Sequence, residues 1–374
     1  MTKIRLAGLT AAQFLRDHWQ KRPLLARDAL PGLGDFLQRD GIFELAARDD
    51  LESRLVVRDG RRWRVRHGPF SARALARLRG GRWSLLVQGI NHVLPAAERL
   101  LRQFAFIPYA RLDDVMVSFA PPGGGVGPHF DSYDVFLAQG AGSRRWRVGP
   151  CRTCELVPNA PLRILRRFRP RHEWVLHPGD MLYLPPHYGH DGVALTDCVT
   201  ISIGFRAPDA AELGRRFLEF LGDRLRLEGH YEDPDLALQR HPAELAPATL
   251  RKVRRMLAGI RWNAGDVAEF LGCHLTEPKA HVVFSRPSRP LVPRRFAGAR
   301  LRRGLRLAPA TRMLFHRGRV FMNGESSATD NRTARALTAL ADRRELAPGS
   351  RVDVQLMDQL YEWYRAGYIV LGDE

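Results

Sequence analysis

Two histidines and one aspartate are the residues of this chain whose types and spacing could bind a catalytic metal. His129 and Asp131 stand two positions apart in GPHFDSYD, and His190 follows later in PPHYGHDG. Side chains at positions i and i+2 of a strand point to the same face, so His129 and Asp131 can reach one ion from one strand. Two imidazoles and a carboxylate are the donor set of non-haem iron(II) oxygenases, and they leave positions open for other ligands. The spacing therefore predicts an iron site.

The identity of the third ligand is open, because His187 lies in the same turn as His190. We favour His190, since it lies where the chain re-enters the next strand, and we expect His187 near the pocket mouth or in solvent. The alternative is that these histidines are ordinary loop residues, because an H-x-D pair occurs by chance in many proteins. Cys151 and Cys154 form a single C-x-x-C pair, which we interpret as loop residues, because a structural zinc site needs four ligands.

Three arginines follow the H-x-D segment after the turn QGAGS: Arg144, Arg145 and Arg147. A 2-oxoglutarate oxygenase needs a cation for the far carboxylate of its co-substrate. Arginine suits this task, because its planar fork donates two parallel hydrogen bonds to a carboxylate. We expect at most one of the three to point inward. The alternative is that all three are solvated side chains of an arginine-rich protein.

Small or polar residues alternate with apolar ones in two of the expected strands. The residues of this polar face are Met116, Ser118, Cys198, Thr200 and Ser202. In a barrel with a wet interior, such a face looks toward the ligand. The alternative reverses the two faces and places the polar side chains in water.

The elements that must position these residues are short strands separated by turns with glycine or proline. The clearest strands are 115–119, 134–139, 144–149, 173–177, 180–185 and 198–205. Short, evenly spaced strands predict a small antiparallel barrel or sandwich. Before them, apolar spacing predicts helices over 9–19, with Thr10 as the cap, and over 94–104.

The pattern changes after Arg206 from strands to helices. Helical spacing is found at 209–225, 241–260 and 263–275, and 280–310 is expected to be a linker with strand pieces. A hairpin over 313–324, helices over 331–342 and 353–366, and a strand over 368–371 complete the chain. This last group resembles a winged helix, so the predicted fold class is α+β.

The chain is strongly basic, with a formal net charge of +19 over 374 residues. Such a charge favours contact with polyanions such as ribosomal RNA. However, arginine supplies nearly all of it, and a GC-rich genome produces the same skew without a function. No apolar run reaches membrane-spanning length and no signal-peptide core is found, so we expect no membrane contact and a cytoplasmic location. Four cysteines indicate no disulfide framework.

Taken together, the motifs resemble the JmjC-type ribosomal oxygenases. The segments that carry the resemblance are GGGVGPHFDSYDVFLAQGAGSRRWRVG, PGDMLYLPPHYGHDG, SIGFRAP and the N-terminal HWQKRPLL. The resemblance spans the whole chain and looks closest to the bacterial branch that hydroxylates an arginine of a large-subunit ribosomal protein. It implies a double-stranded β-helix, or cupin-like, oxygenase domain over 1–206, a helical dimerisation region over 207–285 and a winged-helix-like domain over 286–374.

The resemblance also implies a homodimer, a ribosomal protein as substrate, and iron(II), 2-oxoglutarate and dioxygen as cofactor and co-substrates. The residues that match the family's site are the iron ligands His129, Asp131 and His190, the 2-oxoglutarate-binding Arg144, and the polar Ser118 and Thr200 near the ligands.

An arginine substrate requires acidic and aromatic partners, for which Tyr133 and Asp134 are the first candidates and Asp113 and Asp114 the next. Simple strand and turn polarity is the alternative for each of them. Three other functions stay open: a histidine hydroxylase of another ribosomal protein, a cupin-type enzyme without 2-oxoglutarate, and a non-catalytic ribosome- or RNA-binding protein. The last would use basic residues of the C-terminal part, namely Arg312, Arg317 and Arg319.

Overall fold

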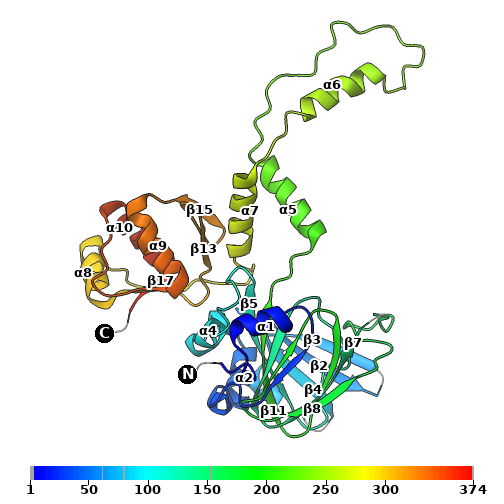
Figure 1. Ribbon diagram of the computed structural model, residues 1–374, viewed down its shortest axis with the longest axis vertical. Helices are drawn as coiled ribbons and strands as arrows, with labels where there is room; N and C mark the ends of the chain where they lie inside the picture. The colour runs from blue at the N-terminus through cyan, green and yellow to red at the C-terminus, as the bar shows by residue number, and fades with distance from the viewer. Residues whose placement is uncertain (1–3, 61, 79–80, 152–153, 373–374) are drawn as a thin grey trace.

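The computed structural model describes residues 4–372 apart from 61, 79–80 and 152–153. Figure 1 shows a β-rich body, a helical segment that extends away from it, and a C-terminal unit of helices and small sheets beside the body. This order agrees with the expected order along the chain.

An antiparallel sheet of eight strands forms the larger wall of the body. In sheet order its strands are β1 (Leu24–Ala26), β9 (Met181–Leu184), β6 (Val135–Ala141), β11 (Cys198–Phe205), β5 (Leu112–Ala120), β4 (Arg82–Val87), β2 (Ser53–Asp59) and β3 (Arg62–His67). β11 lies between β5 and β6, so it is paired along both edges.

A second antiparallel sheet of three strands faces the first. Its order is β10 (Tyr188–Ala194), β7 (Arg144–Pro150) and β8 (His172–Leu176). Buried apolar side chains from both sheets pack together in one cluster, and they are Val135, Leu137, Trp146, Val148, Leu176, Leu182 and Leu184. The expected two-layered antiparallel architecture is therefore present.

Short helices pack on the body: α1 (Ala11–Asp17), α2 (Arg39–Ala46), α3 (Ala72–Ala76), α4 (Pro95–Arg102) and the 3-10 turns Leu33–Asp35 and Ile90–His92. The predicted cap is confirmed, because Thr10 and Gln13 form a reciprocal capping box at α1. Phe14 of α1 lies edge-on to the fully buried Tyr183, with ring centroids 4.9 Å apart. Each large apolar side chain buried this way contributes about 1.5–3 kcal/mol.

The two faces of β11 serve two different environments. Val199, Ile201 and Ile203 are buried in the main core of the body. Thr200 and Ser202 point the other way and line a cavity between the sheets. The alternative that placed this polar face in water is therefore wrong.

The helical region consists of α5 (Ala210–Gly222), α6 (Pro247–Leu257) and α7 (Ala264–Thr276). α6 stands away from the rest of the chain at the top of Figure 1. α7 instead packs against the C-terminal unit, where Glu269 accepts from Arg319 at 2.8 Å and Thr276 accepts from the Gly324 N–H at 3.0 Å. The expected boundary between residues 285 and 286 therefore separates α7 from the unit that it contacts.

The C-terminal unit contains two small sheets and three helices. They are α8 (Pro293–Arg303), β12 (Leu305–Leu307), β13 (Met313–His316), β14 (Arg319–Met322), β15 (Glu325–Ala328), α9 (Asn331–Arg343), β16 (Glu345–Leu346), α10 (Val354–Ala366) and β17 (Ile369–Leu371). The expectation of a linker over 280–310 was wrong at α8. Proline at the start of this helix and the buried Phe296 and Ala299 are helix signals within an arginine-rich stretch.

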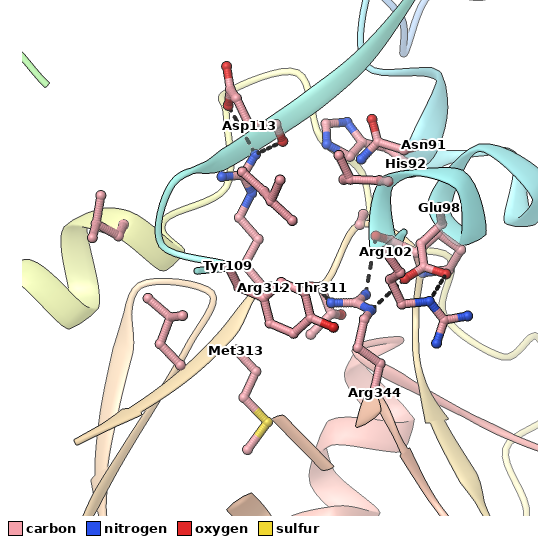
Figure 2. Close-up of a pocket in the computed structure, with 16 residues that line it drawn as sticks. Asn91, His92, Glu98, Arg102, Tyr109, Asp113, Thr311, Arg312, Met313 and Arg344 are labelled. Carbon is pink, nitrogen blue, oxygen red and sulfur yellow. Dashed lines mark hydrogen bonds and ion pairs between the residues drawn. The ribbon is translucent and has the colours of Figure 1, made fainter. Parts of the chain in front are cut away.

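Ion pairs join the C-terminal unit to the body around a small cavity of about 70 Å³. Figure 2 shows Arg312 directed at Asp113, and Arg344 beside Glu98. The distances are 3.2 Å for Arg312–Asp113 and 2.7 Å for Arg344–Glu98. All four side chains are largely buried, so these pairs are screened less by solvent than surface pairs.

Candidate active site

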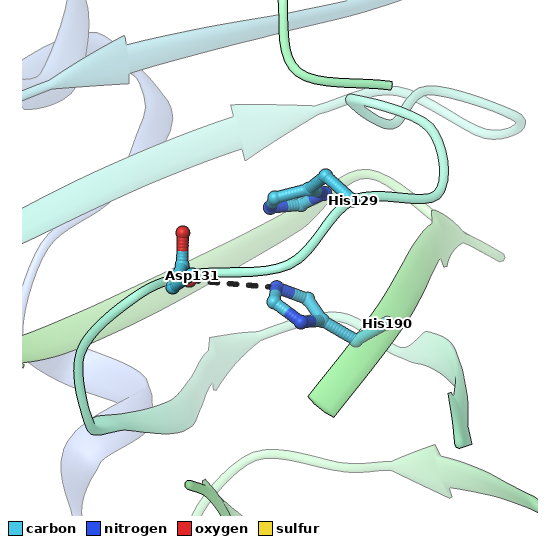
Figure 3. A group of neighbouring side chains, drawn as sticks. All are labelled: His129, Asp131 and His190. Carbon is cyan, nitrogen blue, oxygen red and sulfur yellow. Dashed lines mark ion pairs between the residues drawn. The ribbon is translucent and has the colours of Figure 1, made fainter. Parts of the chain in front are cut away.

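Three side chains converge at the cavity between the two sheets. The ligand atoms of His129, Asp131 and His190 all lie within 4.8 Å of one another, as Figure 3 illustrates. Nε2 of His190 lies 3.7 Å from Oδ2 of Asp131, and the two imidazole centroids are 4.2 Å apart. Two nitrogen donors and one carboxylate in this arrangement fit an iron(II) ion.

Hydrogen bonds orient both imidazoles toward the centre of this cluster. Nδ1 of His129 lies 2.8 Å from the Gly127 carbonyl, and Nδ1 of His190 lies 3.1 Å from the Tyr188 carbonyl. A carbonyl only accepts, so each Nδ1 carries a proton, and Nε2 is the ring atom left to bind a metal. Burial, with a smaller effect of His129, lowers the pKa of His190 to about 4, so its ring is neutral at neutral pH, as a metal ligand must be.

The local backbone differs from the expectation in two ways. His129 and Asp131 lie in an extended loop between β5 and β6, and only a single bridge pairs His129 with His190. His190 lies within β10 rather than in a turn. The three side chains still converge, because two backbone hydrogen bonds hold these segments together. The His129 N–H donates to the His190 carbonyl at 3.0 Å, and the His190 N–H donates to the His129 carbonyl at 2.8 Å.

His187 does not join the cluster. Its side chain is exposed, and its backbone N–H donates to the Asp131 carbonyl at 3.0 Å. Its carbonyl accepts from the Cys151 N–H at 3.0 Å. His187 therefore supports the position of the loop that carries Asp131 through its backbone.

Arg144 is the one arginine of the β7 trio that lines the large cavity. It is 5% exposed, and its guanidinium lies 5.6 Å from the Trp146 ring. Among the described residues, no hydrogen-bond partner lies within reach of its Nε and Nη2. Arg147 instead pairs with the buried Asp191. A buried guanidinium with unused donors fits a carboxylate ligand.

The cavity between the sheets has a volume of about 550 Å³. Ser118 and Thr200 line it from neighbouring strands, where they form a cross-strand pair. The Thr200 hydroxyl donates to Oε1 of Gln139 at 3.2 Å, and the Ser118 hydroxyl donates weakly to the Thr200 carbonyl at 3.4 Å. Both hydroxyls keep free acceptor capacity toward the cavity.

The two candidate substrate residues have opposite positions. Tyr133 lines the cavity and is 42% exposed. Asp134 is fully buried on the other side, where it accepts from Tyr183 at 2.6 Å and from Gln20 at 2.9 Å. Consecutive residues of an extended chain point to opposite faces, so Asp134 does not reach the cavity, and the sequence expectation for it was wrong.

Besides Asp131, two acidic residues line the cavity, Asp114 and its neighbour Asp113. Asp114 is 3% exposed and accepts from Nε2 of Gln88 at 2.9 Å and from Nζ of Lys279 at 3.1 Å. Sequence reasoning missed Gln88 and Lys279, because both lie outside the periodic strands. It also overlooked Trp146, whose alternation with Arg144 on β7 was a usable signal.

Two of the three basic residues that suggested an RNA surface are engaged within the protein. Arg312 pairs with Asp113, and Arg319 pairs with Glu269. Arg317 lies exposed at the turn between β13 and β14. In the described part of the chain, no helix has the length and apolar character needed to cross a membrane.

Comparison with known proteins relates this chain to a known family. The JmjC domain matches residues 99–213, and the ROXA-like winged helix matches residues 259–369. The ribosomal protein uL16 3-hydroxylase of Escherichia coli is 36% identical over 332 residues, which are 88% of this chain and 87% of that protein.

Solved structures agree over nearly the whole length. An X-ray structure of E. coli YcfD aligns with a TM-score of 0.85 and 32% identity, over 99% of this chain and 100% of that chain. A second structure shows YcfD, a ribosomal oxygenase from E. coli, in complex with cobalt and 2-oxoglutarate. It aligns with a TM-score of 0.83 and 33% identity, over 98% and 99% of the two chains.

These matches define a JmjC oxygenase with a cupin-like β-sandwich core and a C-terminal winged-helix domain. The chain belongs to the ribosomal oxygenase family. Its enzyme class follows: it is an oxygenase that depends on iron(II) and 2-oxoglutarate. The expected α+β fold, with its double-stranded β-helix core, and the expected cofactors are confirmed.

Proposed function

We propose that this protein hydroxylates an arginine side chain of the large-subunit ribosomal protein uL16. One observation carries the proposal: a cluster of metal-type donors, a buried guanidinium with unused donors, a buried carboxylate and a tyrosine all line one cavity of about 550 Å³. The likeness to the E. coli uL16 3-hydroxylase supports this substrate.

His129, Asp131 and His190 would hold the iron. The donor set fits the ion, because the Nδ1 atoms of both rings face backbone carbonyls, which leaves two Nε2 atoms beside one carboxylate. When bound together, the iron, 2-oxoglutarate and dioxygen supply the oxidation that inserts one oxygen atom into a carbon–hydrogen bond, with succinate and carbon dioxide as the other products. The protein's own task is to position the target carbon and limit the access of water.

Arg144 would bind the distal carboxylate of 2-oxoglutarate with the two donors that have no protein partner. Trp146 holds this guanidinium from one side and lies 5.8 Å from the His190 ring, so one indole supports both ligand sites. Ser118 and Thr200 would contribute hydroxyls to the same cavity wall.

Tyr133 and Asp114 would receive the substrate. An arginine side chain keeps its charge when it enters a protein, so it requires a carboxylate partner, which Asp114 offers. A neutral histidine side chain has no such requirement. The buried carboxylate at the cavity therefore favours arginine over histidine as the target, and Tyr133 adds an aromatic face at the opening.

The test uses purified protein with iron(II), 2-oxoglutarate and a uL16 peptide, and measures the mass of the peptide. We expect a gain of one oxygen atom at arginine with the wild type, and no gain with His129→Ala or Asp131→Ala. His187→Ala is the matched control, because this exposed histidine lies beside the cluster without joining it. A wild-type protein that leaves the peptide mass unchanged while it turns over 2-oxoglutarate would refute the substrate.

The helical region supports a second part of the proposal, a homodimer. Large apolar side chains on and around α6 are exposed: Leu236, Leu238, Leu245, Leu250, Met256, Leu257 and Trp262. Large apolar side chains exposed in such number within one segment are typical of a protein interface. We expect Leu250→Asp to convert a dimer into a monomer in light scattering, whereas a monomeric wild type would contradict the dimer. The proposed ribosomal substrate also favours a cytoplasmic location for the protein.

A further inference from the structure

The acid pair Asp113–Asp114 at the start of β5 connects the active-site cavity with the C-terminal half of the chain. Asp113 lies near three cations, with distances of 3.2 Å to Lys279, 3.2 Å to Arg312 and 3.4 Å to Arg206. Asp114 is placed differently. Within the described residues, Lys279 is the one cation within ion-pair distance of its carboxylate, at 3.1 Å.

Lys279 reaches the cavity from outside the oxygenase fold. It follows α7 by three residues, and Figure 1 shows α7 between the C-terminal unit and the end of the body near β5. Its side chain is 33% exposed, whereas the Asp114 side chain is 4% exposed. The lysine head can therefore move toward water, but the Asp114 carboxylate must keep a partner, because an unpaired buried charge is costly.

We propose that Lys279 is a resident counter-ion that competes with the substrate cation for Asp114, and that it thereby sets the specificity of the cavity. This inference rests on the proposed arginine substrate. In the free protein, Lys279 satisfies the Asp114 carboxylate. When a guanidinium enters, two cations face one carboxylate, and Lys279 yields because it retains Asp113 at 3.2 Å.

The competition selects between substrate side chains. A neutral side chain gains no ion pair and leaves Lys279 on Asp114. A guanidinium offers two parallel hydrogen bonds to a carboxylate, whereas the resident ammonium offers a point charge, so arginine replaces lysine at a net gain. Lys279 thus lowers the affinity for every cation, and arginine is the side chain best able to overcome that cost.

The test is a binding measurement by calorimetry. The full-length protein carries iron(II) and 2-oxoglutarate without dioxygen, so that no turnover occurs, and the probe is a uL16 peptide that contains the target arginine. Lys279→Met removes the competing charge and keeps the length of the side chain. We expect a Kd about tenfold lower than that of the wild type. Lys279→Arg should instead raise the Kd above the wild-type value, because a resident guanidinium holds the Asp114 carboxylate with the same two hydrogen bonds as the substrate.

Two controls separate competition from a structural role. Lys252→Met makes the same replacement in a lysine–aspartate pair far from the cavity, with Asp235, and should leave the Kd unchanged. The same peptide with glutamine in place of arginine should not bind Lys279→Met more tightly. In an Asp114→Asn background, Lys279→Met should have no further effect, because the competition acts through that carboxylate.

Unchanged or weaker binding by Lys279→Met would overturn the inference, as would a gain that persists in the Asp114→Asn background. If Lys279→Met unfolds at a much lower urea concentration than the wild type, Lys279→Gln repeats the comparison with a polar, uncharged side chain. A wild-type protein that neither binds nor hydroxylates the arginine peptide refutes the proposed function itself. If the wild type binds and hydroxylates the arginine peptide, and Lys279→Met binds it with the same Kd, only the role of Lys279 is refuted.

Discussion

The unused donors of Arg144 lead to a prediction in which binding and stability respond differently. In the free protein, the buried Nε and Nη2 of Arg144 have no hydrogen-bond partner among the described residues. Such donors cost free energy until a ligand accepts from them. Arg144→Met should therefore weaken 2-oxoglutarate binding strongly and leave the free energy of unfolding without co-substrate nearly unchanged.

The magnitude follows from the contacts that are lost. Hydrogen bonds to charged groups contribute about 1.5–3 kcal/mol each, and part of a two-bond contribution is offset by water that enters the vacated space. A net loss of about 3 kcal/mol corresponds to an increase in the KM for 2-oxoglutarate of about 100-fold. Arg144→Lys keeps the charge but loses the planar fork, so its KM for 2-oxoglutarate should lie between those of the wild type and Arg144→Met.

The assay follows succinate formation over a range of 2-oxoglutarate concentrations, together with urea unfolding without co-substrate. Arg145→Met is the matched control, since Arg145 is the next residue on β7 and does not line the cavity. The reasoning is refuted if Arg144→Met raises the KM less than about threefold, or if it costs more than about 2 kcal/mol of stability without co-substrate.

Three further predictions concern the framework around the site. Burial and nearby cations lower the pKa of His92 from 6.5 to about 3, so the unfolded chain binds a proton that the folded chain refuses, and stability falls as the pH drops below 6.5. Between pH 7 and pH 5 this group lowers the free energy of unfolding by about 2 kcal/mol. His92→Gln lacks the titrating ring, so urea unfolding at both pH values should show that it loses about 2 kcal/mol less than the wild type. Glu98→Gln leaves Arg344 without its carboxylate, and denaturant unfolding should show a loss of about 2 kcal/mol. Gly192→Ala places a Cβ 2.6 Å from the Trp146 ring, and cobalt titration should show weaker metal binding because that ring contacts His190.

Much of the site was predictable because strands have a strict period. The alternation over 198–205 indicated that Thr200 and Ser202 share a face, and the structure places both on the cavity. The alternation over 144–149 likewise separated Arg144 from Arg145 and Arg147, and Arg144 is the one of the three that lines the cavity. A period of two assigns faces directly, so these predictions needed no knowledge of distant contacts.

The errors about the site lie where the sequence shows no period. The loop from 121 to 134 follows no strand pattern, so the sequence could not decide which of Tyr133 and Asp134 faces the ligand. Lys279 reaches Asp114 across 165 positions of sequence, and no local signal marks such a pair. β10 was read as a turn, because YGHDGVA carries few apolar residues for a strand.

The two faces of β11 limit how relatives of this protein can diverge. It pairs with both β5 and β6, and the register is continuous along both edges from Thr200 to Ile203. An insertion or deletion within this continuous segment would exchange the faces beyond it, turning isoleucines toward the ligands and hydroxyls into the core. Relatives can therefore change the length of the connecting loops, whereas the length of this strand should be constant among those that remain active.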